Sequence, residues 1–133
     1  MPAQFVVQLQ NRPGALADFA KALAAHGVDI VDISGGGVGD VGYAMLTTSD
    51  DERTREVLRR SSHHFAEGRP IRVEIQDRPG ELASVTEHLA AAGININGVV
   101  LVGRTATTVE IALTVDDPDL ARRVLGLEPA LGV

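Results

Sequence analysis

Two short stretches of the sequence carry residue types that could bind a small anion. They read QNRPGALA at Gln10–Ala17 and QDRPGELA at Gln76–Ala83. The proline of each stretch suits the first position of a helix, because its φ is preset and the N–H that it lacks would be unpaired there. A turn that opens a helix leaves unpaired N–H groups at the positive end of the helix dipole, where a ligand carboxylate is stabilised. Gly14 and Gly80 have no side chain, so a ligand can approach the backbone closely.

The same residues also have a purely structural interpretation. Asn11 and Asp77 stand where a side chain could cap the helix. Each glycine could simply permit close packing between the helix and a sheet. The two roles are compatible, and the residue types alone do not choose between them.

A glycine-rich segment and a histidine pair are the other candidates for chemistry, and neither has a suitable context. GVGDVG at Gly37–Gly42 matches the G-x-G-x-x-G pattern of dinucleotide sites, but it joins two expected strands instead of opening a helix. His63 and His64 are adjacent, so in a strand they would point to opposite faces, and no further ligand stands at metal-binding spacing. No serine lies in a G-x-S-x-G motif. We therefore expect no catalytic residue, no metal and no cofactor.

Composition and charge narrow the class of protein. The 133 residues carry 12 basic and 18 acidic side chains and a net charge of −6, which argues against binding of nucleic acid. Cysteine is absent, and no apolar run reaches the ~18–20 residues of a membrane span. The N-terminus lacks the basic segment and apolar stretch of a signal peptide. The sequence therefore predicts a cytoplasmic protein with no membrane partner.

The two stretches belong to a longer internal repeat. Gln76 corresponds to Gln10 at an offset of 66 (76 − 10), and the same offset relates later segments, with no insertion or deletion expected anywhere. A constant offset over this length predicts a duplicated structural unit, with residues 1–67 as the first unit and 68–133 as the second. The equivalent segments are residues 23–25 and 89–91, residues 27–30 and 93–96, and Asp50-Asp51 and Asp116-Asp117.

Each unit has the pattern of strand, helix, two strands and helix. Alternating apolar residues predict the first strand, and apolar residues at helical spacing follow the proline. A weak fourth strand is expected near His63–Glu67, whereas Pro129 disfavours its counterpart in LEPALGV at residues 127–133. The order predicts an α+β protein of two ferredoxin-like βαββαβ units, each an antiparallel sheet with its helices on one face. Since a unit of this size is marginal alone, we expect the two to lie side by side.

The expected sheet faces suggest an assembly. Aligned at the constant offset, Tyr43, Met45 and Thr47 correspond to Val109, Ile111 and Leu113. The side chains expected on the face away from the helices in the first unit are Val6, Val31, Ala44 and Leu46, and their counterparts are Arg72, Asn97, Glu110 and Ala112. The more apolar face of the first unit predicts a homodimer that buries it.

At these positions the chain resembles the ACT-domain family, in two tandem copies that cover nearly its whole length. The motifs are Asx-x-Pro-Gly-x-Leu at the helix start and Gly-x-Asx-Ile before the second strand, and each occurs twice. The resemblance implies a regulatory module without catalytic activity that binds a small ligand, most often an amino acid, at an interface between two such domains. The positions that it implies for the ligand are Asn11, Arg12, Pro13, Gly14, Ala15, Leu16, Asp29, Asp77, Arg78, Pro79, Gly80, Glu81, Leu82, Asn95, Ile96 and Asn97.

The copies differ in charge at these positions. The family pattern joins the Asx of one turn to the Asx before the second strand of a neighbouring unit. A site that joins Asn11 with Asn95 would be nearly neutral. A site that joins Asp77 with Asp29 would be acidic and would bind a carboxylate poorly. We therefore expect one competent site, built from Asn11, Gly14 and Asn95. The alternative function is an interaction module, or a regulatory subunit of an enzyme of amino-acid metabolism, that binds no free ligand.

Overall fold

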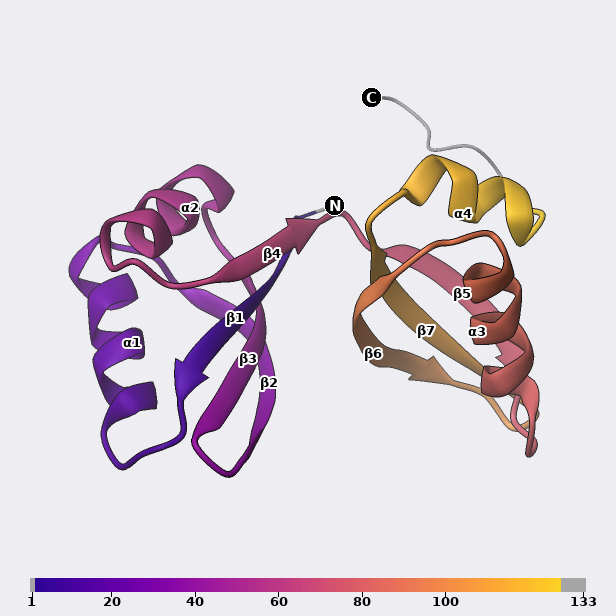
Figure 1. The fold of residues 1–133 in the computed structure, drawn as a ribbon, viewed down its shortest axis with the longest axis horizontal. Coiled ribbons are helices and arrows are strands. Elements are labelled where there is room, and N and C mark those ends of the chain that lie inside the picture. The colour runs from indigo at the N-terminus through magenta and orange to yellow at the C-terminus, as the bar shows by residue number, and fades with distance from the viewer. Residues whose placement is uncertain (1, 128–133) are drawn as a thin grey trace. The chain divides into compact units, whose positions relative to one another are not determined.

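The chain folds into two compact units that divide between Glu67 and Gly68 (Figure 1). The structure is a computed structural model, and it describes residues 2–127. The first unit consists of β1 (Gln4–Gln10), α1 (Ala15–Ala25), β2 (Ile30–Val38), β3 (Val41–Thr48), α2 (Asp51–Arg60) and β4 (Phe65–Gly68). The second consists of β5 (Ile71–Gln76), α3 (Glu81–Ala91), β6 (Ile96–Arg104), β7 (Thr108–Val115) and α4 (Pro118–Val124).

Each unit has one sheet, with the ferredoxin-like order that the sequence predicts. The strand order is β2-β3-β1-β4 in the first unit and β5-β7-β6 in the second, and β3 and β7 run antiparallel to both of their neighbours. The α+β ferredoxin-like fold is thus confirmed, as is the fourth strand expected near His63–Glu67. The segment in which Pro129 disfavours a fourth strand lies, apart from Leu127, outside the described residues.

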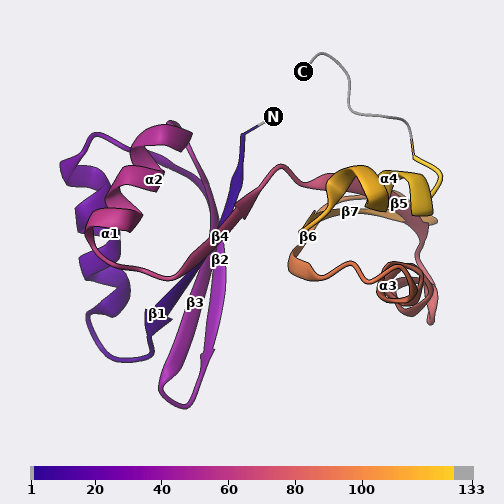
Figure 2. The same cartoon turned by 45° about the horizontal axis from the view of Figure 1, so that its top comes forward.

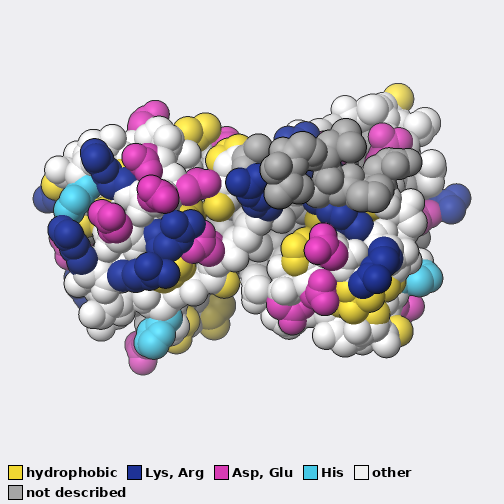
Figure 3. Space-filling model, turned by 90° about the horizontal axis from the view of Figure 1, so that it is seen from above, with side chains coloured by type: hydrophobic (Ala, Val, Ile, Leu, Met, Phe, Trp, Pro, Cys, Tyr) yellow, Lys and Arg dark blue, Asp and Glu magenta, His cyan; other side chains and the backbone are white. Residues whose placement is uncertain are grey.

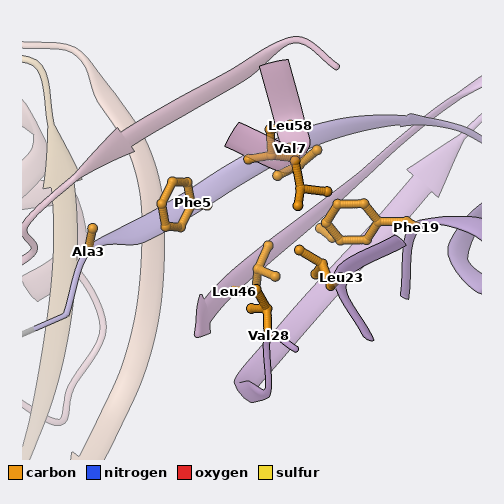
Figure 4. Packing of buried hydrophobic residues seen from close by; sticks show 10 residues of the cluster. Ala3, Phe5, Val7, Phe19, Leu23, Val28, Leu46 and Leu58 are labelled. Atoms are coloured by element: carbon orange, nitrogen blue, oxygen red, sulfur yellow. The ribbon is translucent and has the colours of Figure 1, made fainter. Parts of the chain in front are cut away.

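The helices of the first unit pack on one face of its sheet (Figure 2). Figure 4 shows the core that results, with Phe5 and Val7 from β1 facing Phe19 and Leu23 from α1. These four side chains are buried because the period of two in the strand and of 3.6 in the helix bring them to the same interface. The second unit has an equivalent cluster of residues from β5, α3, β7 and α4.

The offset between the two units changes by one within the second strand of the repeat. Gly35 pairs with Ala44 and Leu101 pairs with Ile111, but the next pairs along are Gly36 with Tyr43 and Gly103 with Glu110. The register of β6 shifts between Leu101 and Gly103, where β2 has no such irregularity, so Val102 is an extra residue in a bulge. The offset is therefore 66 at Leu101 (101 − 35) and 67 at Gly103 (103 − 36). The expectation of a repeat without insertion is wrong from this bulge onward.

One residue of offset exchanges the two faces of a strand, since successive side chains point to opposite sides. Ala44 and Leu46 were expected on the face away from the helices, but both lie in the core. Leu46 is 1% exposed and is labelled in Figure 4. Val41, Tyr43 and Met45 take the opposite face. The assignment of Ala44 and Leu46 to the open face is thus wrong. The homodimer stays a prediction, and of the four residues named for this face only Val6 and Val31 remain to support it.

The helix that follows the third strand obeys the corrected offset. The side chain of Asp50 accepts from the N–H of Arg53, and that of Asp117, its counterpart at an offset of 67 (117 − 50), accepts from the N–H of Leu120. Asp116 corresponds to Ser49 instead of Asp50. Ser49 Oγ accepts from the N–H of Asp29, and the Asp116 carboxylate accepts from the N–H of Asn95.

The surface shows no concentration of one charge on the face in view. Figure 3 shows basic and acidic side chains interspersed over both units. Among residues 2–127, no helix has the length and hydrophobicity that crossing a bilayer requires.

The corrected register predicts unequal costs for two adjacent substitutions. Leu46→Ala leaves a cavity in the core and should lower the free energy of unfolding by about 2–5 kcal/mol. Met45→Ala, on the opposite face, should cost about 1 kcal/mol or less. Urea unfolding followed by circular dichroism measures both values, and equal losses would contradict the register.

Candidate functional site

The turn that opens α1 begins the helix without a side-chain cap. The N-cap is Gly14, with φ 90°, and α3 begins in the same way at Gly80, also with φ 90°. This left-handed conformation strains any residue with a Cβ, which explains the glycine at both positions. The expectation that the proline of each turn takes the first helical position is wrong, because both prolines precede the N-cap. Neither Asn11 nor Asp77 caps its helix, so the capping role considered for them is wrong.

The start of α1 leaves two backbone donors unused. Ala15 N–H donates to the carbonyl of Arg12 at 3.2 Å, and the regular helical pattern begins with Asp18 N–H to Gly14 O at 2.9 Å. Between them, the N–H groups of Leu16 and Ala17 have no acceptor among residues 2–127. These are the groups that a carboxylate could accept from at the positive end of a helix.

Asn11 ties this turn to the β2–β3 hairpin, which lies beside it in Figure 1. Its Nδ2 donates to the carbonyl of Gly39 at 2.9 Å, and its backbone N–H donates to the carbonyl of Asp40 at 3.0 Å. Gly37 makes room for this side chain, because a Cβ there would lie 2.7 Å from Asn11 Cγ. The first glycine of GVGDVG thus serves the packing of the hairpin against the turn.

The second unit places an ion pair where the first has Asn11 and Gly37. The carboxylate of Asp77 accepts a hydrogen bond from Arg104, at the end of β6. Arg104 pairs with Val109 as Gly37 pairs with Gly42, so the counterpart of this cation in the first unit is a glycine. Sequence reasoning missed Arg104, because the extra residue at Val102 aligns it with Val38 at the constant offset. The expected acidic site joined Asp77 with Asp29, and Arg104 now offsets the charge of Asp77 within its own unit.

A pocket of about 390 Å³ lies against the first turn and edge strand β2. Residues 9–12, 15–16, 33–36 and 42–44 line it, and we refer to it as the turn pocket. Of the predicted site residues, it brings together Asn11, Arg12, Ala15 and Leu16. Pro13 and Gly14 complete the same turn but do not line the pocket.

The predicted residues before the second strand lie at the other end of their own sheet. Asp29 precedes β2, whereas the turn lies beside the far end of β2, roughly 26 Å along the strand. In the second unit, Asn95 and Asn97 are exposed, and Asn95 Nδ2 donates to Asn97 Oδ1 at 3.0 Å. Ile96 is half-buried against the core. Within one unit, these residues and the turn therefore cannot share a ligand.

The predicted residues of the second turn serve mostly surface contacts. Arg78 forms an ion pair with Glu81 in the first turn of α3, and Pro79 and Gly80 are exposed. Leu82 is exposed like Leu16, its counterpart. The N–H groups of Leu82 and Ala83 have no acceptor in the described part of the chain, as in the first unit.

A second hollow, of about 500 Å³, lies between α1, the end of β1 and the turn that joins α2 to β4. The His63 ring meets the Phe19 ring edge-on at 5.5 Å, and its Nδ1 lies 2.7 Å from Ser61 Oγ. Burial lowers the pKa of His63 from its ordinary value. Arg12, Asp18 and Asp40 also line this hollow, and its mixed charges indicate no single ligand class. Among residues 2–127, no group of three or more histidine or acidic side chains is arranged to hold a metal ion.

Comparison with known proteins gives one family match and several similar folds. The family model described as the ACT domain matches residues 3–60. No curated protein sequence matches the chain significantly.

The similar folds are solved structures of low sequence identity. A protein from Bacteroides thetaiotaomicron has a TM-score of 0.61 and 19% identity, over 94% of this chain and 86% of the other. The ligand-free regulatory subunit of aspartate kinase from Thermus thermophilus has a TM-score of 0.55 and 18% identity, over 94% and 91%. The corresponding subunit from Thermus flavus has a TM-score of 0.56 and 18% identity, over 95% and 90%. At these identities the likeness shows the fold.

The burial of His63 predicts a pH dependence of stability. Because its pKa is lowered in the folded state, the unfolded chain binds more protons below about pH 6.5, and the free energy of unfolding falls as the pH falls. His63→Gln should make this decline shallower between about pH 7 and 5. Urea unfolding at a series of pH values measures it, with the exposed His64→Gln as the control. A decline as steep in His63→Gln as in the wild type would contradict the assignment.

Proposed function

Residues 3–60 belong to the ACT-domain family, and on this premise we propose that the protein is a regulatory module that binds a small amino acid at its first turn. The second unit repeats the turn motif and the fold. The proposed role involves no catalysis, in keeping with the regulatory subunits of aspartate kinase whose fold the chain shares. We further propose that the protein is cytoplasmic, acts as a homodimer and has no nucleic-acid or membrane partner.

The observation that carries the proposal is the pair of unused N–H groups at Leu16 and Ala17. Gly14 precedes them without a side chain that would cover them. Arg12 lines the adjoining turn pocket and forms an exposed ion pair with Asp18 at 3.6 Å, so a carboxylate there would have backbone donors and would share the positive charge of Arg12 with Asp18. The turn is fixed by the hydrogen bonds of Asn11 to the hairpin, and a preformed site loses little entropy on binding.

Asn95 is the further residue of the proposed site. In the family pattern, a neighbouring unit supplies the Asx before its second strand, and Asn95 occupies that position. Its exposed amide has free acceptor and donor capacity beyond the bond to Asn97. Asn95→Ala should therefore weaken amino-acid binding as measured by calorimetry, and an unchanged affinity would remove Asn95 from the site.

The alternative is an interaction module that binds no free ligand. Exposed apolar side chains at the tip of the β2–β3 hairpin favour it, since Val38 is 86% exposed and Val41 and Tyr43 lie close by on β3. Surfaces of this kind often serve as interfaces. A ligand screen separates the two functions.

The test is a thermal-shift screen against the twenty amino acids, followed by calorimetry on those that stabilise. A ligand at a hundredfold excess over its dissociation constant should stabilise the protein by about 2.7 kcal/mol. Asn11→Asp places a negative charge beside the carboxylate and should weaken binding about tenfold or more. Asp77→Asn, the reciprocal exchange in the second unit, is the matched control and should leave the affinity unchanged. The proposal fails if no amino acid stabilises the protein or if Asn11→Asp binds as the wild type does.

A further inference from the structure

The turn pocket exists because several of its lining positions have small residues. Four lining glycines and alanines have larger counterparts in the second unit, which are found at an offset of 66 before the bulge at Val102 and of 67 after it. The pairs are Ala15 and Glu81, Gly35 and Leu101, Gly42 and Val109, and Ala44 and Ile111. The remaining glycine of the lining, Gly36, corresponds to another glycine, Gly103. The two units can therefore be compared directly. The first unit has a pocket at these positions, and the second unit has larger side chains there.

The lining of the turn pocket is mostly apolar, and the only charged side chain in it is positive. Leu9, Leu16, Ile33 and Ala44 supply the apolar surface, and Arg12 is the one charged residue among those that line it. Leu16 is 54% exposed and Ile33 is 48% exposed, although both lie on the side of the sheet that the helices cover. A ligand in the pocket would cover apolar surface that the fold leaves open to water.

From these observations we propose that the turn pocket selects an amino acid with an uncharged, apolar side chain of about the size of leucine; this rests on the proposed function of the turn. The ligand carboxylate binds the N–H groups of Leu16 and Ala17, and its side chain lies against Leu16 and Ile33. A pocket of about 390 Å³ is large enough for such a ligand.

Charged side chains are disfavoured for two reasons. No acidic residue lines the pocket, so the ammonium group of a lysine side chain would lose its water without gaining a partner. The side-chain carboxylate of an aspartate ligand would lose hydration in the same apolar surroundings. It could not use the positive end of the helix, because the α-carboxylate of the ligand is bound there. The second unit, with larger side chains at the equivalent positions, should bind none of these ligands in this way.

Ile33→Thr tests the inference. It keeps a β-branched residue on an exposed edge strand and replaces the ethyl group of the isoleucine side chain by a hydroxyl. Calorimetry with leucine, alanine, aspartate and lysine measures the effect. Wild-type protein should bind leucine at least about tenfold more tightly than the other three amino acids. Ile33→Thr should weaken leucine binding about fivefold to tenfold and leave alanine binding nearly unchanged, because alanine is too short to reach this residue.

Val99→Thr, at the equivalent position of the second unit, is the matched control and should leave leucine binding unchanged. Ala15→Leu fills the pocket without changing its charge. It should weaken the binding of leucine by a larger factor than the binding of alanine. If aspartate or lysine binds best, or if Ile33→Thr weakens leucine and alanine equally, this inference is overturned while the proposed function stands. If no amino acid binds the wild type at all, the proposed function itself fails.

Discussion

The antiparallel pairing of β1 with β3 is the constraint on which the first unit depends. It sets Phe5 opposite Leu46 and Val7 opposite Ala44, so both strands turn these side chains toward the helices. Because α1 and α2 cover that face, the pairing decides which residues form the core. It also places the end of β1, and therefore the turn at Gly14, beside the β2–β3 hairpin. The hydrogen bonds from Asn11 to the hairpin follow from this register.

The fold was predictable from sequence because periodicity alone indicates its elements. Apolar alternation in β1 and helical spacing in α1 each point to the element that forms, and the duplication supplies each pattern twice. The helix starts were predictable only approximately. Each helix follows its proline and glycine, which constrain the backbone by themselves, but the proline precedes the N-cap glycine instead of taking the first helical position.

The register of β3 was not predictable in the same way. Ala44 and Leu46 alternate with Tyr43 and Met45, so both faces of the strand are apolar and the pattern does not say which is buried. The constant offset then gave the wrong face, because a single extra residue in the bulge at Val102 leaves no mark on the repeat motifs. Strand pairing shows the true offset, and the two helix caps at Asp50 and Asp117 show it independently.

The candidate site was partly predictable, because some of its features depend on local sequence and others on contacts between distant segments. Backbone donors at a helix start follow from local sequence, and the structure shows them unused at Leu16 and Ala17. The partner of Asp77 and the residues of the pocket depend on contacts between distant segments. The whole of α3 separates Asp77 from Arg104 in the sequence, and most of α1 separates Leu16 from Ile33. Only the sheet register brings such residues together.

The small residues that open the turn pocket also have a cost in stability. Gly35, Gly36 and Gly37 lie consecutively in edge strand β2, where glycine loses more conformational entropy on folding than other residues do and has no side chain to pack. The residues paired in the same way in β6 are Leu101, Gly103 and Arg104. A strand of low intrinsic stability beside a binding pocket is the part of a fold that a ligand stabilises most by mass action. On the proposed function, ligand binding therefore stabilises the first unit. The stability of the second unit, which has the Arg104–Asp77 pair, does not depend on the ligand.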